Sequence, residues 1–254
     1  MSRKTNKNMS ENFKMIAKTF YGFEDILSEE LLALGAQKIN KGNRNVSFYG
    51  DKGFLYKSNL SLRTALKILK PVCEFRFKDI NEYYDNIYNF KWEDYIGPTG
   101  SFLINSLVFH SHVFNNSKFT SLKAKDAIVD RFRDKFKKRP SINSFNPELR
   151  IEIHVNRNTC TISLDSSGES LHKRGYKKYN SAAPLNEVLA AGIVLMSKWD
   201  KKSDLLDPMC GTGTFLIEAA MIAKNIAPNL NRLSFAFEKW KDWDNELFEI
   251  IEES

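Results

Sequence analysis

Apolar and polar side chains alternate or recur at regular spacing from the first strand of the chain onward. Residues 13–19 alternate as a strand does, and residues 23–34 repeat apolar side chains at the spacing of a helix. Gly35 is expected to end that helix, because glycine favours the position just after a helix. The first two elements are therefore a strand and a helix.

The pattern continues with two more strands, a second helix and a final strand. Residues 37–41 and 45–49 predict two strands joined by a short turn, and Asp51 is expected to cap the helix that follows. Residues 64–77 are apolar and predict an extended segment. The order strand–helix–strand–strand–helix–strand predicts a ferredoxin-like domain over residues 13–77.

A second unit with both helices and strands is predicted for residues 78–165. Pro140 follows its longer helix and is expected to end it, because proline disfavours helical backbone just before it. The last two strands lie three residues apart and predict a hairpin. The expected elements are helices at 81–90 and 121–138 and strands at 101–109, 149–155 and 159–165.

The last part of the chain has a different pattern. Residues 166–180 are polar and basic and are interpreted as a linker. A strand, a loop and a helix then follow in the order that begins a doubly wound α/β domain, so residues 181–254 predict an incomplete Rossmann-like domain. The expected elements are a helix at 184–198, a short buried strand at 205–207, a loop at 208–213 and a helix at 214–224.

Composition limits the possible settings of this α+β and α/β chain. Apolar residues make up 42% of 254 and charged residues 27%, which predicts a folded protein, with residues 1–12 expected to be disordered. No run of 18 apolar residues and no signal peptide is found, so no membrane partner is expected. The three cysteines are widely spaced and predict neither disulfides nor a metal site, which favours a reducing, cytoplasmic setting.

The net charge of +7 favours nucleic acid as a partner, and its excess is local. Residues 118–139 hold nine basic and three acidic side chains, and a second basic cluster lies in the linker. Such a row could neutralise backbone phosphates. The alternative is a solvated helix face, in which carboxylates at i, i+4 spacing pair with their basic neighbours. The candidate RNA-binding residues are Lys123, Lys125, Arg131, Arg133, Lys137, Lys138, Arg139, Lys173 and Arg174.

The strongest chemical signal is the loop before the last long helix. Its small residues let the backbone approach a ligand, and the free amides of the helix would face that ligand. A P-loop would need Lys-Ser/Thr after Gly213, and a dinucleotide fingerprint would need a glycine at Leu216, so both are excluded. The candidate cofactor-binding residues are Asp207, Pro208, Met209, Cys210, Gly211, Thr212, Gly213 and Thr214.

Residues 205–220 closely resemble the first motif of class I S-adenosylmethionine-dependent methyltransferases. The segment is most similar to the THUMP-containing RNA methyltransferases that modify guanine N2 in large-subunit ribosomal RNA. Further resemblance lies in residues 171–176, 183–191, 225–228 and 235–240. It implies a ferredoxin-like domain, a THUMP domain over residues 78–165, and a methyltransferase domain that uses S-adenosyl-L-methionine and acts on RNA.

The resemblance also implies roles within the loop. Asp207 and the backbone of residues 210–214 are expected to hold the methionine part of the cofactor; the alternative for Asp207 is a helix cap or turn former. Cys210 is not expected to be a nucleophile, because it lies inside the cofactor loop. Residues 184–191 are expected either to pack beside the cofactor or to form an ordinary core helix. His110 and His112 are interpreted as structural strand residues.

Two features of the family are not found among these residues. The catalytic Asn/Asp-Pro-Pro-Tyr/Phe segment is absent, since the chain contains no Pro-Pro, and so is the acidic residue that should follow the second sheet strand. The sequence therefore predicts a truncated methyltransferase domain, inactive alone and completed by a missing segment or a separate chain. A parallel sheet with one strand cannot close a core, so the last 70 or so residues are expected to be marginally stable alone.

Three interpretations remain at this stage. The first is an RNA methyltransferase, or the front fragment of one. The second is an RNA-binding module in which the loop at 207–214 is vestigial and does not bind a cofactor. The third is an unrelated nucleotide-binding enzyme, which the missing P-loop lysine disfavours.

Overall fold

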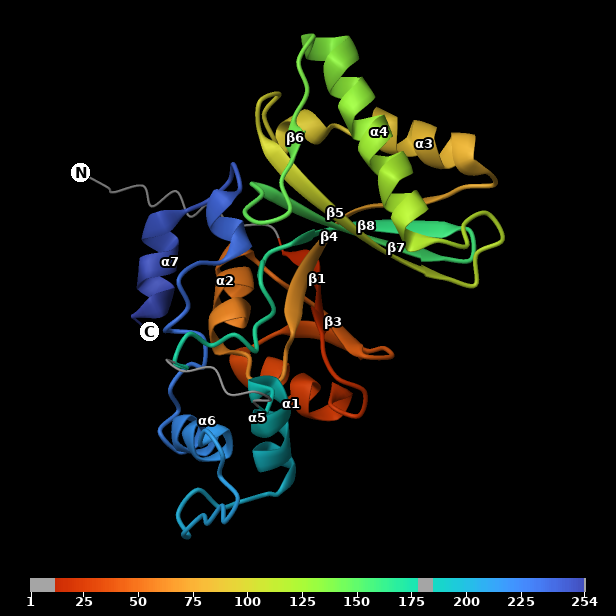
Figure 1. Cartoon of the computed structure of the whole chain (residues 1–254). Coiled ribbons are helices and arrows are strands. Elements are labelled where there is room, and N and C mark those ends of the chain that lie inside the picture. The colour runs from red at the N-terminus through yellow and green to blue at the C-terminus, as the bar shows by residue number, and fades with distance from the viewer. Residues whose placement is uncertain (1–11, 178–184, 254) are drawn as a thin grey trace, which may run out of the picture.

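The computed structural model describes residues 12–177 and 185–253, and Figure 1 shows the path of the chain through them. An eight-stranded sheet runs through the described residues in the order β2–β3–β1–β4–β8–β7–β5–β6. Residues 1–11 of the segment 1–12 that was predicted to be disordered lie outside the described residues, as does the part of the predicted linker after residue 177, including Lys178, and Pro184.

The first half forms the ferredoxin-like arrangement that the pattern predicts. Its strands pair antiparallel in the order β2–β3–β1–β4. Gly35 ends the first helix with a φ of 98°, and the Asp51 carboxylate caps the second by accepting the amide of Phe54 at 2.8 Å. The elements are β1 (Phe13–Lys18), α1 (Glu24–Leu34), β2 (Gln37–Lys41), β3 (Asn45–Gly50), α2 (Lys52–Ser61) and β4 (Lys67–Arg76).

The second unit places two helices over one face of its strands (Figure 1). Its long helix α4 begins four residues earlier than expected, because the side chain of Asn116 accepts the amide of Lys118 at 2.8 Å and caps the first turn. The elements are α3 (Ile80–Asn89), a 3₁₀ turn (Trp92–Asp94), β5 (Ser101–Phe109), α4 (Ser117–Phe136), β6 (Ser141–Ile142), β7 (Leu149–Asn156) and β8 (Thr159–Asp165).

Strand β4 belongs to both halves. Near its start it pairs with β1, with Lys18 opposite Lys67, and from Leu69 to Arg76 it pairs with β8. The predicted boundary at residue 77 therefore falls just beyond a strand that the two units share. The two units form one continuous sheet, and hydrogen bonds within that sheet fix how they sit relative to each other.

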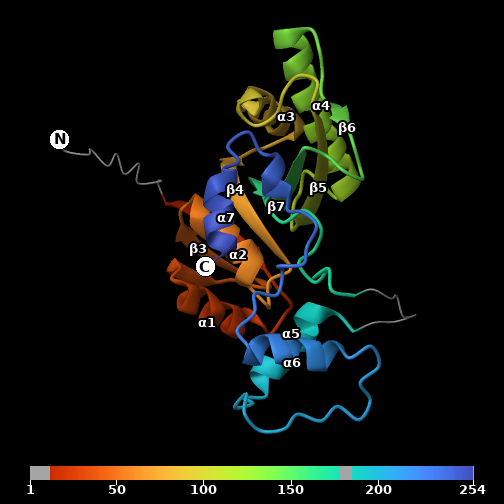
Figure 2. The ribbon, with the colours of Figure 1, turned by 90° about the vertical axis from the view of Figure 1, so that its left-hand side faces the viewer.

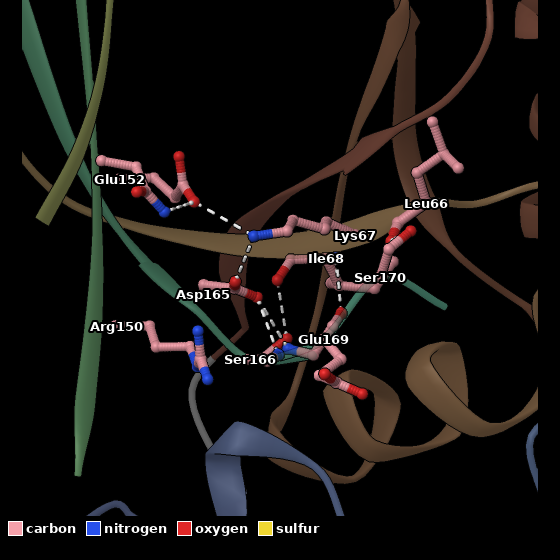
Figure 3. Close-up of polar contacts among 12 residues, drawn as sticks. Leu66, Lys67, Ile68, Arg150, Glu152, Asp165, Ser166, Glu169 and Ser170 are labelled. Carbon is pink, nitrogen blue, oxygen red and sulfur yellow. Dashed lines mark hydrogen bonds and ion pairs between the residues drawn. The ribbon is translucent and has the colours of Figure 1, made fainter. Parts of the chain in front are cut away.

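A buried polar cluster supports this shared strand (Figure 3). Lys67 Nζ lies 2.7 Å from Asp165 Oδ2 and 3.1 Å from Glu152 Oε1, so one ammonium links β4, β8 and β7. Asp165 is fully buried, and its other oxygen accepts the amides of Ser167 and Gly168, both at 3.0 Å. The cluster is satisfied by hydrogen bonds, as buried charge requires.

The C-terminal part divides into two packing groups (Figure 2). Helices α5 (Glu187–Met196) and α6 (Thr214–Ala223) pack on each other, and α5 contacts α1. That contact needs glycine at position 192, because an added Cβ would lie 2.1 Å from the ring of Phe23. Beyond them, a second 3₁₀ turn (Ala236–Lys239) and α7 (Asn245–Glu252) return to the first half, and α7 lies beside α2.

The returning segment is part of the main core. The ring of Tyr56 on α2 stacks on Phe237 with centroids 4.6 Å apart and makes edge contacts with Trp243 and Phe248 at 5.2 and 5.9 Å. Burial raises the pKa of Tyr56 to about 12. Residues 235–251 therefore share the hydrophobic core of the ferredoxin-like half rather than forming a separate marginal unit.

The predicted buried strand at 205–207 is wrong. These residues have no regular secondary structure, and Leu206 is 87% exposed. A strand needs a neighbour to take its backbone hydrogen bonds, and no described strand lies beside it.

Within residues 12–177 and 185–253, no helix combines the length and the apolar character that crossing a bilayer demands.

The core position of the returning segment can be tested with Phe237→Ala. Phe237 is fully buried, so we expect its truncation to lower the free energy of unfolding by about 3–5 kcal/mol in urea denaturation. Leu233→Ala is the matched control, because Leu233 lies in the same segment with a fully exposed side chain; its effect should stay within about 0.5 kcal/mol. Equal stability of the two variants would contradict the assignment.

Candidate functional site

The predicted cofactor loop lies at the surface, at the start of α6. The side chains of residues 208–212 are exposed, and Met209 is 90% exposed. The Asp207 carboxylate accepts the amide of Met209 at 3.1 Å, and the amide of Gly213 donates to the Cys210 carbonyl at 2.7 Å. These two bonds fold the loop into consecutive turns that end at the helix, and Asp207 stands at the first of them.

Two glycines shape the end of the loop. Gly211 and Gly213 have φ angles of 52° and 73°, a region that favours glycine. Within residues 12–177 and 185–253, no heavy atom beyond the neighbouring backbone lies within 4 Å of where a Cβ would stand at either position. Among the described residues, no side chain caps the start of α6 at Gly213, so the first amides of the helix are left without a side-chain acceptor. The residues present therefore fit a ligand carboxylate at the positive end of the helix.

A buried charge network lies behind this loop. Glu218, one turn into α6, is fully buried and accepts the hydroxyl of Tyr176 at 2.9 Å. The guanidinium of Arg174 lies 3.5 Å from the same oxygen. Burial raises the pKa of the Glu218 carboxyl, and the charge of Arg174 opposes that rise. Burial beside this carboxylate also raises the pKa of Tyr176.

The prediction that Arg174 contacts RNA is corrected by the burial of its side chain. Its side chain is 1% exposed, and it donates to the carbonyls of Leu171 at 2.8 Å and Arg63 at 2.6 Å. A guanidinium enclosed in this way is not available to an RNA phosphate. The basic pattern in the linker was therefore misinterpreted for Arg174, because sequence alone does not separate an exposed cation from a buried one. Lys173 is exposed and pairs with Glu169 at 2.9 Å.

The connector up to residue 177 is bound to the rest of the molecule on both sides. The guanidinium of Arg232 donates to four of its carbonyl groups, those of Ser167, Glu169, Ser170 and Lys173, at 2.8–3.3 Å. At its end, Lys177 Nζ lies 2.6 Å from Glu187 Oε1 on α5. This part of the predicted linker is a fixed bridge between the sheet and the helices that carry the cofactor loop.

The basic residues predicted on α4 fall into two groups. Arg131 is mostly buried and makes two hydrogen bonds to Glu93, at 2.8 and 2.7 Å, and these hold the pKa of that carboxyl well below its usual range. Arg131 thus links α4 to the 3₁₀ turn at Trp92–Asp94, and the Glu93 carboxylate neutralises the charge of Arg131. Lys125 and Arg133 pair with Asp126 and Asp130 at 2.7 and 3.1 Å, as the alternative of a solvated face expected.

The end of α4 carries the remaining predicted cations. Lys137, Lys138 and Arg139 are exposed and follow one another where the helix ends, and within the described residues no acidic side chain forms an ion pair with them. Lys123 is half-buried, with its ammonium 5.8 Å from the ring centroid of Phe119. The structure therefore concentrates unpaired positive charge at residues 137–139.

Several site residues were missed by sequence analysis. Tyr176, Glu218 and Arg232 were not singled out, yet they fix the cofactor loop and the connector. Glu218 itself could have revealed the network in the sequence, because an acidic residue between Ile217 and Ala219 in an otherwise apolar helix requires a buried partner.

Among the described residues, no group of His, Cys, Asp and Glu is placed to hold a metal ion.

Comparison with protein families matches three consecutive parts of the chain. Residues 14–69 match the RlmL ferredoxin-like domain, residues 77–165 the THUMP domain, and residues 174–252 the RMKL-like methyltransferase domain. These matches follow the order of the units described above. The last one contains both the cofactor loop and the buried Glu218.

Similar proteins include named methyltransferases. The ribosomal RNA large subunit methyltransferase K/L of Cellvibrio japonicus is 41% identical over 236 residues, which cover 91% of this chain and 31% of that protein. A putative RNA methyltransferase of Synechocystis is 37% identical over 91% of this chain and 60% of its own length. The chain thus spans about a third of the K/L relatives and under two thirds of the other.

Solved structures share the fold. A possible methylase from Clostridium difficile superimposes with a TM-score of 0.85 and 32% identity, over 96% of this chain and 64% of that one. A putative methyltransferase solved as a complex with SAH, SMU.472, has a TM-score of 0.83 and 34% identity over the same shares. The fold of this chain therefore recurs in structures described as methylases or methyltransferases.

The buried network can be tested with Glu218→Leu. Removal of the carboxylate leaves the Arg174 charge buried without its partner, so we expect a loss of about 3–5 kcal/mol in the free energy of unfolding. The matched control is Glu246→Leu on α7, where the side chain is exposed and the change should stay within about 0.5 kcal/mol. If thermal unfolding showed the two variants alike, Glu218 would not hold the connector to α6.

Proposed function

Since residues 14–252 of this chain are built from the domains of THUMP-containing methyltransferases, we propose that it serves RNA methylation with S-adenosyl-L-methionine as cofactor. The single observation that carries the proposal is the open loop at residues 207–214, held in place by the buried network behind it. The proposed substrate is large-subunit ribosomal RNA and the proposed acceptor a guanine N2, in keeping with the names of the K/L relatives.

The loop suits the methionine end of this cofactor. The uncapped amides at the start of α6 would donate hydrogen bonds to its carboxylate, and the carboxylate of Asp207 would face its ammonium group. When bound, the cofactor supplies an electrophilic methyl group. Cys210 has an exposed thiol in the same loop and is assigned no nucleophilic role, because it would lie beside the cofactor rather than beside a base.

The proposal assigns no residue of this chain to the target amine. The family's Asn/Asp-Pro-Pro-Tyr segment, which accepts hydrogen bonds from the amine and stacks on the flipped base, does not occur in residues 1–254. We propose that a segment carrying it, in the same polypeptide or a separate chain, completes the site. The roles of the described residues are to bind RNA, to hold the cofactor, and to fix these two sites relative to each other.

A second candidate is an RNA-binding module with a vestigial loop. The observation that favours it is the exposed, irregular segment at 205–207, where the family motif would place a buried strand. Without that strand, Asp207 stands at no sheet edge. Cofactor binding separates the two candidates, because only the first requires it.

Calorimetric titration with S-adenosylhomocysteine tests the proposal. We expect binding by the native chain and at least about tenfold weaker binding by Gly213→Val, because valine is strained at a φ of 73° and its side chain would cover the helix amides. Gly22→Val is the matched control, with a φ of 86°, open surroundings and no role in the loop. If the native chain shows no heat of binding, the second candidate, with a vestigial loop, is favoured. If Gly213→Val binds as tightly as the native chain, the cofactor does not bind at this loop.

RNA binding by the end of α4 has its own test. The triple variant of Lys137, Lys138 and Arg139 to alanine should bind a labelled ribosomal RNA stem–loop more weakly, with the slope of log affinity against log salt reduced by about 2–3. A control triple variant at exposed Lys201, Lys202 and Lys224 removes the same charge from the cofactor half. If fluorescence anisotropy shows equal losses of RNA affinity for the two triple variants, the loss results from net charge and not from a site at the end of α4.

A further inference from the structure

Two lysines stand opposite each other on one face of the sheet. Met15 and Ala17 of β1 are fully buried in the core. Side chains alternate between the two faces of a strand, so Lys14 and Lys18 lie on the other face. The register places Lys18 directly opposite Lys67 of β4. Side chains that stand opposite each other in an antiparallel pair share a face, so both lysines belong to the same surface.

Lys67 binds the carboxylates that lie near this pair (Figure 3). Its ammonium lies 2.7 Å from Asp165 Oδ2 and 3.1 Å from Glu152 Oε1. The side-chain amide of Asn105 donates to the same Glu152 oxygen at 3.0 Å. The other oxygen of Asp165 accepts two backbone amides, both at 3.0 Å. Both carboxylates are thus already engaged by Lys67 and by amide groups.

Lys18 has no such partner. Its side chain is half-buried, and within residues 12–177 and 185–253 its ammonium forms neither a hydrogen bond nor an ion pair. On the other side of β1, the register places the uncharged Asn45 opposite it. Burial of a charge without a partner disfavours the charged form. Burial accordingly lowers the pKa of Lys18, and the charge of Glu152 opposes that fall only in part.

The two lysines therefore differ in protonation. Burial also acts to lower the pKa of Lys67, but the charges and hydrogen bonds of Asp165 and Glu152 outweigh it and raise that pKa. Lys18 consequently presents a larger fraction of neutral amine near neutral pH than Lys67 does. A neutral amine is a nucleophile and an ammonium is not, so the surroundings of Lys18 activate it and those of Lys67 protect it.

His154 of β7 is a further titratable group within electrostatic reach of Lys18. Burial lowers the pKa of His154, and the charge of Lys18 lowers it further. The imidazole is therefore mostly neutral near neutral pH and supplies no counter-ion to the ammonium. The titratable groups that face Lys18 are thus Lys67, Glu152, Asp165 and His154, and the carboxylates among them are bound to Lys67.

We propose that Lys18 is a modification site, at which an acyl phosphate acylates the amine. The nitrogen attacks the carbonyl carbon of the acyl group, and a carbon–nitrogen amide bond forms. The carbon–oxygen bond to phosphate breaks, inorganic phosphate leaves with the bonding electrons, and the proton of the amine passes to water. The donor must be small, because the side chain is half-buried. The amide product has no charge, so its burial lacks the cost that burial imposes on the ammonium.

Acetylation of the whole chain with acetyl phosphate near neutral pH tests the proposal, with each lysine followed by peptide mass spectrometry. We expect Lys18 to be acetylated at least about threefold faster than Lys14, and Lys67 to be the slowest of the three. Lys14 is the matched comparison, because it lies on the same strand and the same face but is exposed. Exposure alone would make Lys14 the faster of the two.

The unfolded chain provides the control for this measurement. In urea, Lys14 and Lys18 should react at equal rates, because the face that buries Lys18 is lost. If Lys18 reacts no faster than Lys14 in the native chain, the inference fails. It also fails if Lys18 keeps its advantage in urea, because the local sequence and not the folded sheet would then set the reactivity. Neither outcome bears on the proposed function, from which this inference is independent.

NMR titration of the His154 imidazole tests the charge of Lys18 separately. Removal of that charge in Lys18→Met should raise the pKa of His154, because the ammonium contributes to lowering it, and acetylation of the native chain should raise it likewise. Lys14→Met is the matched control and should leave the titration of His154 unchanged. His110 and His112, which were interpreted as structural strand residues, are exposed beyond the end of β5 and serve as reference signals. An unchanged titration of His154 in Lys18→Met would overturn the inference.

Discussion

The placement of the proposed cofactor loop depends on one buried ion pair. Glu218 has no access to solvent, and a carboxylate in that position requires a cation and hydrogen bonds to offset its lost hydration. Arg174 supplies the cation and Tyr176 donates one hydrogen bond, both from the connector. Because Arg174 also binds the carbonyl of Arg63 beside α2, the pair fixes the helix after the loop to the ferredoxin-like half.

The same logic extends along the connector. Arg232 binds four of its carbonyl groups, and Lys177 ends it against Glu187. The Arg232 contacts join segments that are 59–65 residues apart, and every one of these contacts uses a charged group to satisfy backbone or carboxylate oxygens. Through these contacts, the described part of the connector up to residue 177 joins the sheet to α5. Tyr176 and Arg174 join it to α6.

Strand β4 joins the ferredoxin-like half to the second unit, as the connector joins the sheet to α5 and α6. It hydrogen-bonds to β1 at its start and to β8 along most of its length, while Lys67 binds Asp165 and Glu152 beside it. Its near end faces the connector. One strand thus fixes how the ferredoxin-like half and the second unit sit relative to each other.

The sequence by itself determined the elements whose signals are local. Periodicity located β5 and α6 to within a residue, Asp51 and Gly35 marked helix ends, and the loop motif at 207–214 indicated the cofactor. Only the tertiary structure decided which charges are paired, because Arg131, Arg174 and Lys137 look alike in a basic pattern. It also decided that residues 205–207 form no strand and that β4 is shared, since strand pairing and burial depend on neighbours that lie far away along the chain.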